Sequence, residues 1–215
     1  MLNELADTEK DERSYWVRRG LQLEWFTIAW MIVEAAVAIA AGVQAHSLTL
    51  TAFGADSVIE LFSAAVLLWR LDVEIRRGQE FSERAETVAS KIAGGLLFAL
   101  ALYVVASVLW SFWHRSGEEF SVPGLMVALV AIPVMYWLSR SKLRVAEKIG
   151  SRALRADAVE AITCGWLSVV VVVGLAAQLL FHAWWVDGVT SLAIVIFLIR
   201  EGREAWEGDD CCDSD

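Results

Sequence analysis

The sequence has few cysteines and no excess of basic residues, and both shortages exclude whole classes of protein. Its 3 cysteines are Cys164, inside an apolar run, and Cys211 and Cys212 near the end, so no disulfide framework is indicated. The net charge of -9 argues against a nucleic-acid partner. The sequence contains no Ser-His-Asp set, phosphate-binding loop or metalloprotease motif, so we do not expect an enzyme. Residues 1–19 are polar and acidic, which is not the pattern of a cleaved signal peptide.

What the chain has in abundance is apolar sequence. Hydrophobic residues make up 57% of the 215 residues, more than is usual in a soluble domain, and the mean hydropathy is +0.52. A bilayer core about 30 Å thick requires about 20 apolar residues per helix, and six stretches come close to this length. They are, roughly, Leu23–Ala45, Ser47–Trp69, Ile92–Trp113, Val122–Leu138, Ala156–Phe181 and Ala183–Ile199. Lipid tolerates only helices and closed barrels, so the sequence predicts an all-α bundle of six transmembrane helices.

The basic residues indicate how this bundle lies in the membrane. All of the 18 Lys and Arg residues except Arg115 fall on one side of the predicted helices, which places both termini in the cytoplasm by the positive-inside rule. The chain then divides into a cytoplasmic N-terminal segment (1–20), a six-helix membrane domain (21–206) and an acidic Cys-Cys tail (207–215). We expect a multi-pass protein of a cell membrane, and a bacterial inner membrane fits best.

Acidic residues inside the apolar stretches are the informative anomaly. Glu34, Asp56 and Glu60 lie well inside the first two stretches, and Asp157, Glu160 and Asp187 lie nearer the ends of the fifth and sixth. A charge at the bilayer centre costs about 2.5–3.5 kcal/mol on insertion scales, so such residues usually serve function. None of the six stretches contains a Lys or Arg, so these acids need protons or a bound cation. This asymmetry indicates a cation pathway.

The spacing of four residues makes the hypothesis more specific. Asp56 and Glu60 are four apart and leave one face of a helix, and Glu160 and Cys164 repeat this spacing in the fifth stretch. If the two helices pack together, carboxylate oxygens and one sulfur can converge, as a tetrahedral ion such as zinc requires. A thiol donor favours zinc, cobalt or cadmium over magnesium or calcium. The sequence therefore predicts a metal site at these four residues.

Several structural readings stay open beside this hypothesis. Asp56 and Glu60 could be protonated acids hydrogen-bonded between helices, and Cys164 alone is more often a small buried hydrophobe. Asp157, Glu34 and Asp187 form a possible secondary metal or proton pathway. Their alternative roles are, in that order, a helix-capping acid, a protonated packing residue and an interfacial residue at the start of a helix. Cys211 and Cys212 could collect soft metal in the tail, or belong to an unstructured end.

At these positions the chain resembles the cation diffusion facilitator family, over about Trp25 to Trp206. The resemblance rests on three segments, which read SLTLTAFGADSVIE (47–60), SRALRADAVE followed by Cys164 (151–164), and WWVDGV with EGREAW (184–189 and 201–206). It is closest to a short, membrane-only branch without the usual cytoplasmic C-terminal domain.

The resemblance implies a homodimeric antiporter that exchanges a divalent cation for protons and holds no permanent cofactor. The family's transport site takes two ligands from the second helix and two from the fifth, at the positions of Asp56, Glu60, Glu160 and Cys164. The family usually has His or Asp followed by Asp in the fifth helix, where this chain has Glu and Cys. The expected cargo is zinc, cobalt or cadmium.

Two other functions compete with metal export. One is a proton-coupled transporter of another small cation, such as an organic amine, which the tryptophan-rich helices keep open. The other is a membrane accessory or redox protein that works through Cys211 and Cys212 and does not require Asp56 or Glu60.

Overall fold

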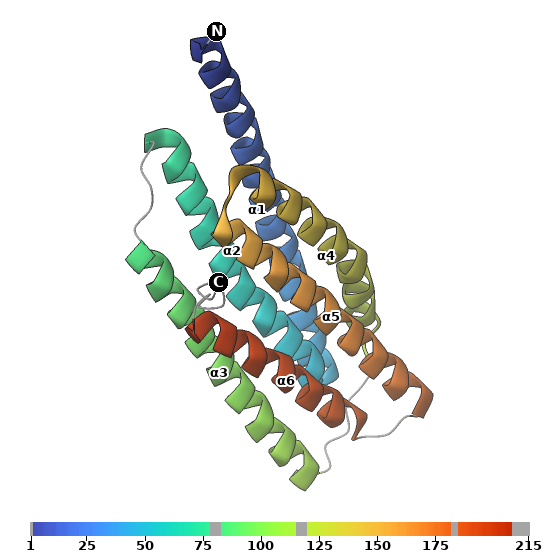
Figure 1. Cartoon of the computed structure of the whole chain (residues 1–215). Helices are drawn as coiled ribbons and strands as arrows, with labels where there is room; N and C mark the ends of the chain where they lie inside the picture. The colour runs from blue at the N-terminus through green and yellow to red at the C-terminus, as the bar shows by residue number, and fades with distance from the viewer. Residues whose placement is uncertain (1, 78–82, 115–119, 182–184, 208–215) are drawn as a thin grey trace, which may run out of the picture.

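The computed structural model of this protein is all-helical and describes residues 2–77, 83–114, 120–181 and 185–207. Its helices are α1 (Leu2–Ala45), α2 (Leu48–Arg77), α3 (Glu83–His114), α4 (Val122–Ile149), α5 (Arg152–Phe181) and α6 (Val186–Glu207). Figure 1 shows them as long rods, with α3 and α6 side by side and α1, α2, α4 and α5 grouped beside them. In the described part of the chain, four helical segments are long and apolar enough to cross a membrane, at Arg13–Ala45, Leu48–Trp69, Val122–Ile149 and Asp157–Leu180. α3 holds a shorter apolar helix, Gly94–Trp110.

Short polar turns separate the helices where the sequence places them. His46 adopts a left-handed conformation (φ 53°), and the next amide, of Ser47, donates to the carbonyl of Gly42. The chain therefore reverses between α1 and α2 within two residues. Ser121 caps the start of α4, since its hydroxyl accepts from the amide of Gly124, and Gly150, with φ 67°, caps the end of the helix. Glycine adopts this left-handed conformation without strain, which stops the helix cleanly.

α1 and α2 approach each other closely because glycines face the contact. A Cβ on Gly42 would lie 2.6 Å from the hydroxyl oxygen of Thr51, and one on Gly54 would lie 2.9 Å from the backbone nitrogen of Ile39. Only glycine fits at such distances, as in the small-residue contacts that hold membrane helices together. These contacts bring the last turns of α1 directly against the first turns of α2, next to the predicted ligand Asp56.

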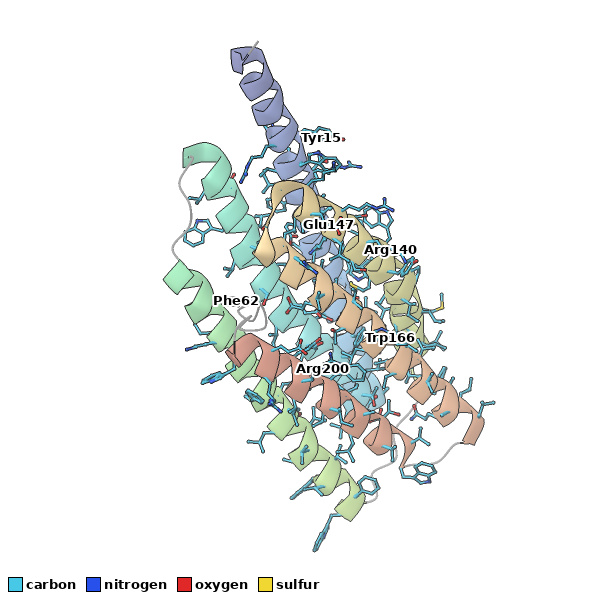
Figure 2. All side chains as sticks on the ribbon, viewed as in Figure 1. Tyr15, Phe62, Arg140, Glu147, Trp166 and Arg200 are labelled. Carbon is cyan, nitrogen blue, oxygen red and sulfur yellow. The ribbon has the colours of Figure 1, made fainter. Side chains whose placement is uncertain are left out.

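The surface and the interior are reversed relative to a soluble protein. Large apolar side chains such as Trp25, Leu102, Trp166 and Ile196 are more than half exposed, while Asp56, Glu34 and Lys142 are almost completely buried. In Figure 2 the outward side chains of α5 include Trp166. An apolar exterior of this extent suits contact with lipid rather than water. The helices therefore support a multi-pass membrane protein.

The structure corrects two expectations about helix ends. α4 does not stop at Leu138 but continues to Ile149, because Gly150 supplies the first stop signal, and α1 begins at Leu2 rather than near Leu23. The longer α4 carries Lys142 into the interior, where it is fully buried. The expectation that the buried acids have no internal base was therefore wrong. His182, which separates the fifth and sixth apolar stretches, lies outside the described residues.

Candidate metal-transport site

α2 supplies the two carboxylates that are least satisfied by the protein. Asp56 and Glu60 lie one turn apart on its buried face, 1% and 7% exposed. Within the described residues, Oδ1 of Asp56 and both carboxylate oxygens of Glu60 are buried without a hydrogen-bond partner. A buried carboxylate in this state is costly unless it holds a proton or a cation. These three oxygens are therefore free to receive either one.

α5 packs against α2 and presents Glu160 and Cys164. Glu160 and Glu60 line one small cavity, with a volume of about 10 Å³, which is near the least space that a water molecule needs. Cys164 is buried, and its thiol donates to Oε1 of Glu34 over 3.8 Å. Within the described ranges, no three His, Cys, Asp or Glu side chains are close enough together to hold a metal ion. The structure thus brings the predicted ligands into one region without drawing them into a coordination shell.

Glu34 connects α1 to this region. Its Oε2 accepts from the indole nitrogen of Trp30 at 2.5 Å, and its Oε1 accepts from the hydroxyl of Ser57 at 2.9 Å and from Cys164. Unlike Asp56, Glu34 therefore has its lone pairs occupied by donors from three helices. It holds the Cys164 thiol in place beside the site.

Charge accumulates where these helices meet. Glu60 interacts electrostatically with Asp56, Glu160, Glu34 and also Glu201 of α6. These acids cannot all be ionised together unless a cation is bound among them, so without one some of them hold protons. Glu201 is not among the predicted site residues, because it follows the predicted end of the sixth stretch at Ile199. Its signal was the buried face of α6, which runs through Ile194, Leu198 and Gly202 and includes position 201 at helical spacing.

Asp157, predicted as part of a secondary pathway, lies in a buried ion cluster. Lys142 of α4 forms an ion pair with Asp157 and a second one with Glu24 of α1, with the ammonium nitrogen 3.1 Å from Oε1 of Glu24. The first turn of α5 is capped by the hydroxyl of Ser151, which accepts from the amide of Leu154, so Asp157 is not the cap of this helix. Lys142 and Asp157 also line the cavity of Glu60 and Glu160.

The family follows from a comparison with known proteins: the model of the cation efflux transmembrane domain matches residues 25–207. This chain belongs to the cation efflux family. The manganese efflux system protein MneS of Bacillus subtilis is 26% identical over 200 residues, which cover 91% of this chain and 68% of that protein. Transmembrane protein 163 of Xenopus laevis is 22% identical over 188 residues (86% and 65%), and the uncharacterized transporter YdbO of Bacillus subtilis is 25% identical over 200 (91% and 68%).

Membership in the cation efflux family makes the chain a metal cation transporter of the membrane rather than an enzyme. The family resemblance that the sequence indicated is confirmed. The chain spans about two thirds of the length of these relatives.

The last predicted site residues of this cation efflux protein lie away from the cavity or outside the description. Asp187, in the first turn of α6, accepts from the backbone amides of Leu48 and Thr49 at 2.9 and 3.2 Å and from the hydroxyl of Ser47. It therefore caps the N-terminus of α2 from a neighbouring helix. Cys211 and Cys212 lie outside the described residues.

Proposed function

We propose that this protein exports a divalent transition-metal ion from the cytoplasm in exchange for protons, with Asp56, Glu60, Glu160 and Cys164 as the ligands. The observation that carries the proposal is the set of three buried carboxylate oxygens on Asp56 and Glu60 that have no partner within the described residues. A cation satisfies them in one state and protons satisfy them in the other. Because ligands must be deprotonated to hold metal, binding weakens as pH falls, and this competition drives the exchange.

The choice of metal turns on Cys164. With its thiol directed at the site, the ligand set of oxygens and one sulfur favours zinc, cobalt or cadmium. In the structure, however, the thiol donates to Glu34, and the remaining donors are all carboxylates, which suit manganese. The relative from Bacillus subtilis that is named for manganese efflux makes manganese the second candidate cargo. Glu34 and Asp157 remain proposed only as parts of a secondary pathway, whereas the hydrogen bonds of Asp187 favour a structural role at the start of α2.

The proposed function extends to the oligomeric state of the protein, its membrane and its orientation. We infer a homodimer in a bacterial inner membrane, with both termini in the cytoplasm, from the family resemblance and from the distribution of basic residues. Reporter domains fused before α1 and after Trp206 are expected to locate to the cytoplasm. Opposite locations would contradict an even number of crossings.

Flux in liposomes that contain the purified protein tests the transport reaction. A metal gradient is imposed, and a pH-sensitive dye and a metal-sensitive dye report on the two sides. We expect zinc, cobalt, cadmium or manganese to drive a countercurrent of protons that stops when the metal gradient is removed. Proton movement with an organic amine but with no metal would favour the other cation transporter. The absence of any flux from correctly folded protein would favour an accessory role.

A further inference from the structure

Lys142 is the unexpected charge of the interior. Its side chain is fully buried in α4, and it pairs with Glu24 of α1 and Asp157 of α5. The cluster therefore ties α1 to the consecutive helices α4 and α5. Burying such a triad costs desolvation energy, and well-packed apolar residues in its place are often at least as stable. Stability alone is therefore a weak explanation for a lysine at this position.

The position of the ammonium relative to the site suggests what else it does. Lys142 lines the same small cavity as Glu60 and Glu160, the facing carboxylates of α2 and α5. The titratable groups around its head group are Glu24 on α1, Asp157 on α5, and these two cavity acids. A cation that approached Glu60 from this end would find the cavity wall occupied by the Lys142 ammonium, which already takes up the carboxylates of Glu24 and Asp157.

The cluster lies at the end of the bundle where α4 passes into α5. Only Gly150 and Ser151 separate the two helices there, and Lys142 and Asp157 lie within about two turns of this connection. This is the end that carries the basic residues around α4 and α5, which we assign to the cytoplasm. At the opposite end of α2, Asp187 binds the helix start. The lysine therefore lies between the proposed cytoplasmic solution and the unpartnered carboxylates.

We propose that Lys142 is a gate residue that closes the transport site toward the cytoplasm while Glu24 and Asp157 hold it. In this state the ammonium of Lys142 is held at the cavity wall, and it excludes a free metal cation from the cavity. Admission of metal requires the ion pairs to part, which separates α4 and α5 from α1. This inference rests on the proposed function, since it concerns how a cation reaches Glu60 and Glu160. It assigns Asp157 to the gate rather than to the coordination shell.

Cys164 offers a direct measure of the gate. The substitutions C211S and C212S leave it as the only thiol in the chain. Two methanethiosulfonate reagents that do not cross membranes, one cationic and one anionic, are applied to vesicles of either orientation. The test variant is E24Q/K142M/D157N, which removes all three charges and leaves no unpaired ion behind. Lys142→Arg is the conservative control, and Glu147→Gln on the exposed side of α4 is the matched surface control.

We expect the triple variant to be modified at Cys164 at least about tenfold faster, with both reagents, and only from the cytoplasmic face, because its closed state has lost the ion pairs. Lys142→Arg and Glu147→Gln should remain within about threefold of the parent, because the gate charge is kept. Labelling of the folded triple variant at the parent rate would overturn the gate, and so would equal acceleration from both faces, which indicates general loosening. Faster modification by the anionic reagent alone would also overturn the gate, because the loss of acidic charge from the cluster would by itself explain that result.

Thermal unfolding of each variant in detergent establishes that the labelled protein is folded. The labelling experiment does not require transport, so its outcome is separate from that of the proposed function. If Asp56→Asn transports metal like the parent, the transport site is wrong whatever the labelling shows. If Asp56→Asn is inactive and the triple variant labels slowly, only the gate is wrong.

Discussion

Two buried acidic sites, Asp187 at the start of α2 and the pair Asp56 and Glu60 within α2, differ in how many hydrogen bonds their carboxylate oxygens accept. Asp187, at the helix start, receives two backbone amides and the hydroxyl of Ser47, and its neighbour Ser191 lies 3.4 Å away. Asp56, two turns along α2, has a buried oxygen without a partner in the described structure, and Glu60 has two. Both places were predicted as parts of a metal pathway from the same kind of evidence. Their hydrogen bonds indicate different roles, one in the architecture and one in binding.

The strongest test of this difference is the removal of charge at the unpartnered acid. Asp56→Asn should reduce metal transport by at least about a hundredfold, because the neutral amide is a poor metal ligand and cannot exchange protons. The fold should survive, since a neutral group costs less to bury than a carboxylate. Metal uptake into liposomes is the measurement, with Glu60→Gln as a second variant.

The matched control is Glu147→Gln, an exposed acid on α4 that Figure 2 labels beside the outer end of that helix. It should transport at the parent rate. If Asp56→Asn and Glu60→Gln both behave like this control, the site is misplaced.

The opposite pattern is expected at the satisfied acid. Asp187→Ala removes the cap of α2 and leaves buried donors unpaired, and should lower the free energy of unfolding by about 2–3 kcal/mol. The apparent affinity for metal should change little in protein that remains folded. Unfolding in mixed micelles gives the first quantity and initial uptake rates give the second.

Glu204→Gln serves as the control for Asp187, because Glu204 pairs with Arg200 on the exposed surface at 3.0 Å. Its loss should cost less than about 0.5 kcal/mol. A transport defect in Asp187→Ala without destabilisation would move Asp187 into the pathway.

A smaller effect is expected at Cys164, which combines features of the hydrogen-bonded acid and of the unpartnered acids. Its thiol has a partner, Glu34, yet it can reach a metal only by leaving that partner. Cys164→Ser should reduce transport of zinc and cadmium about tenfold relative to manganese, because it removes the soft donor. Cys164→Asp should shift the preference toward manganese or iron. Competition between metals in the uptake assay measures the ratio, and an unchanged ratio would exclude the thiol as a ligand.

The smallest effect should come from the tail. Removing Glu207 to Asp215 is expected to leave the maximal rate of transport within about twofold, since no ligand position of the membrane domain is touched. Apparent affinity for zinc can fall if Cys211 and Cys212 collect metal. Complete loss of transport in truncated protein that reaches the membrane would support the accessory or redox function.

The sequence predicted the helices well because their signals are local. The length of the apolar stretches alone indicated all six helices. The predicted helix ends were less accurate, because a helix can continue through charged residues beyond its apolar part. Lys142 illustrates why: a basic residue after Leu138 resembles a loop residue at the membrane surface until its partners are known.

The residues of the candidate site could be predicted from the sequence, but the contacts between their side chains could not. Asp56 and Glu60 could be placed on one face of α2 from spacing alone. The contact of Cys164 with Glu34 and that of Lys142 with Glu24 join positions more than 100 residues apart, and no periodicity encodes them. Glu201 was missed because charge at the end of an apolar stretch was taken as the membrane boundary.

The glycine contacts between α1 and α2 limit how the protein can move. With Gly42 and Gly54 seated against the facing backbone, the two helices cannot slide along each other without steric overlap. They form a rigid body that carries Glu34, Asp56 and Glu60 as one unit. Any alternation between the two sides of the membrane must then be a hinge or shear at the contacts of this pair with α3, α4, α5 and α6. A substitution such as Gly54→Ala should therefore disturb the assembly of this unit rather than the chemistry of its acids.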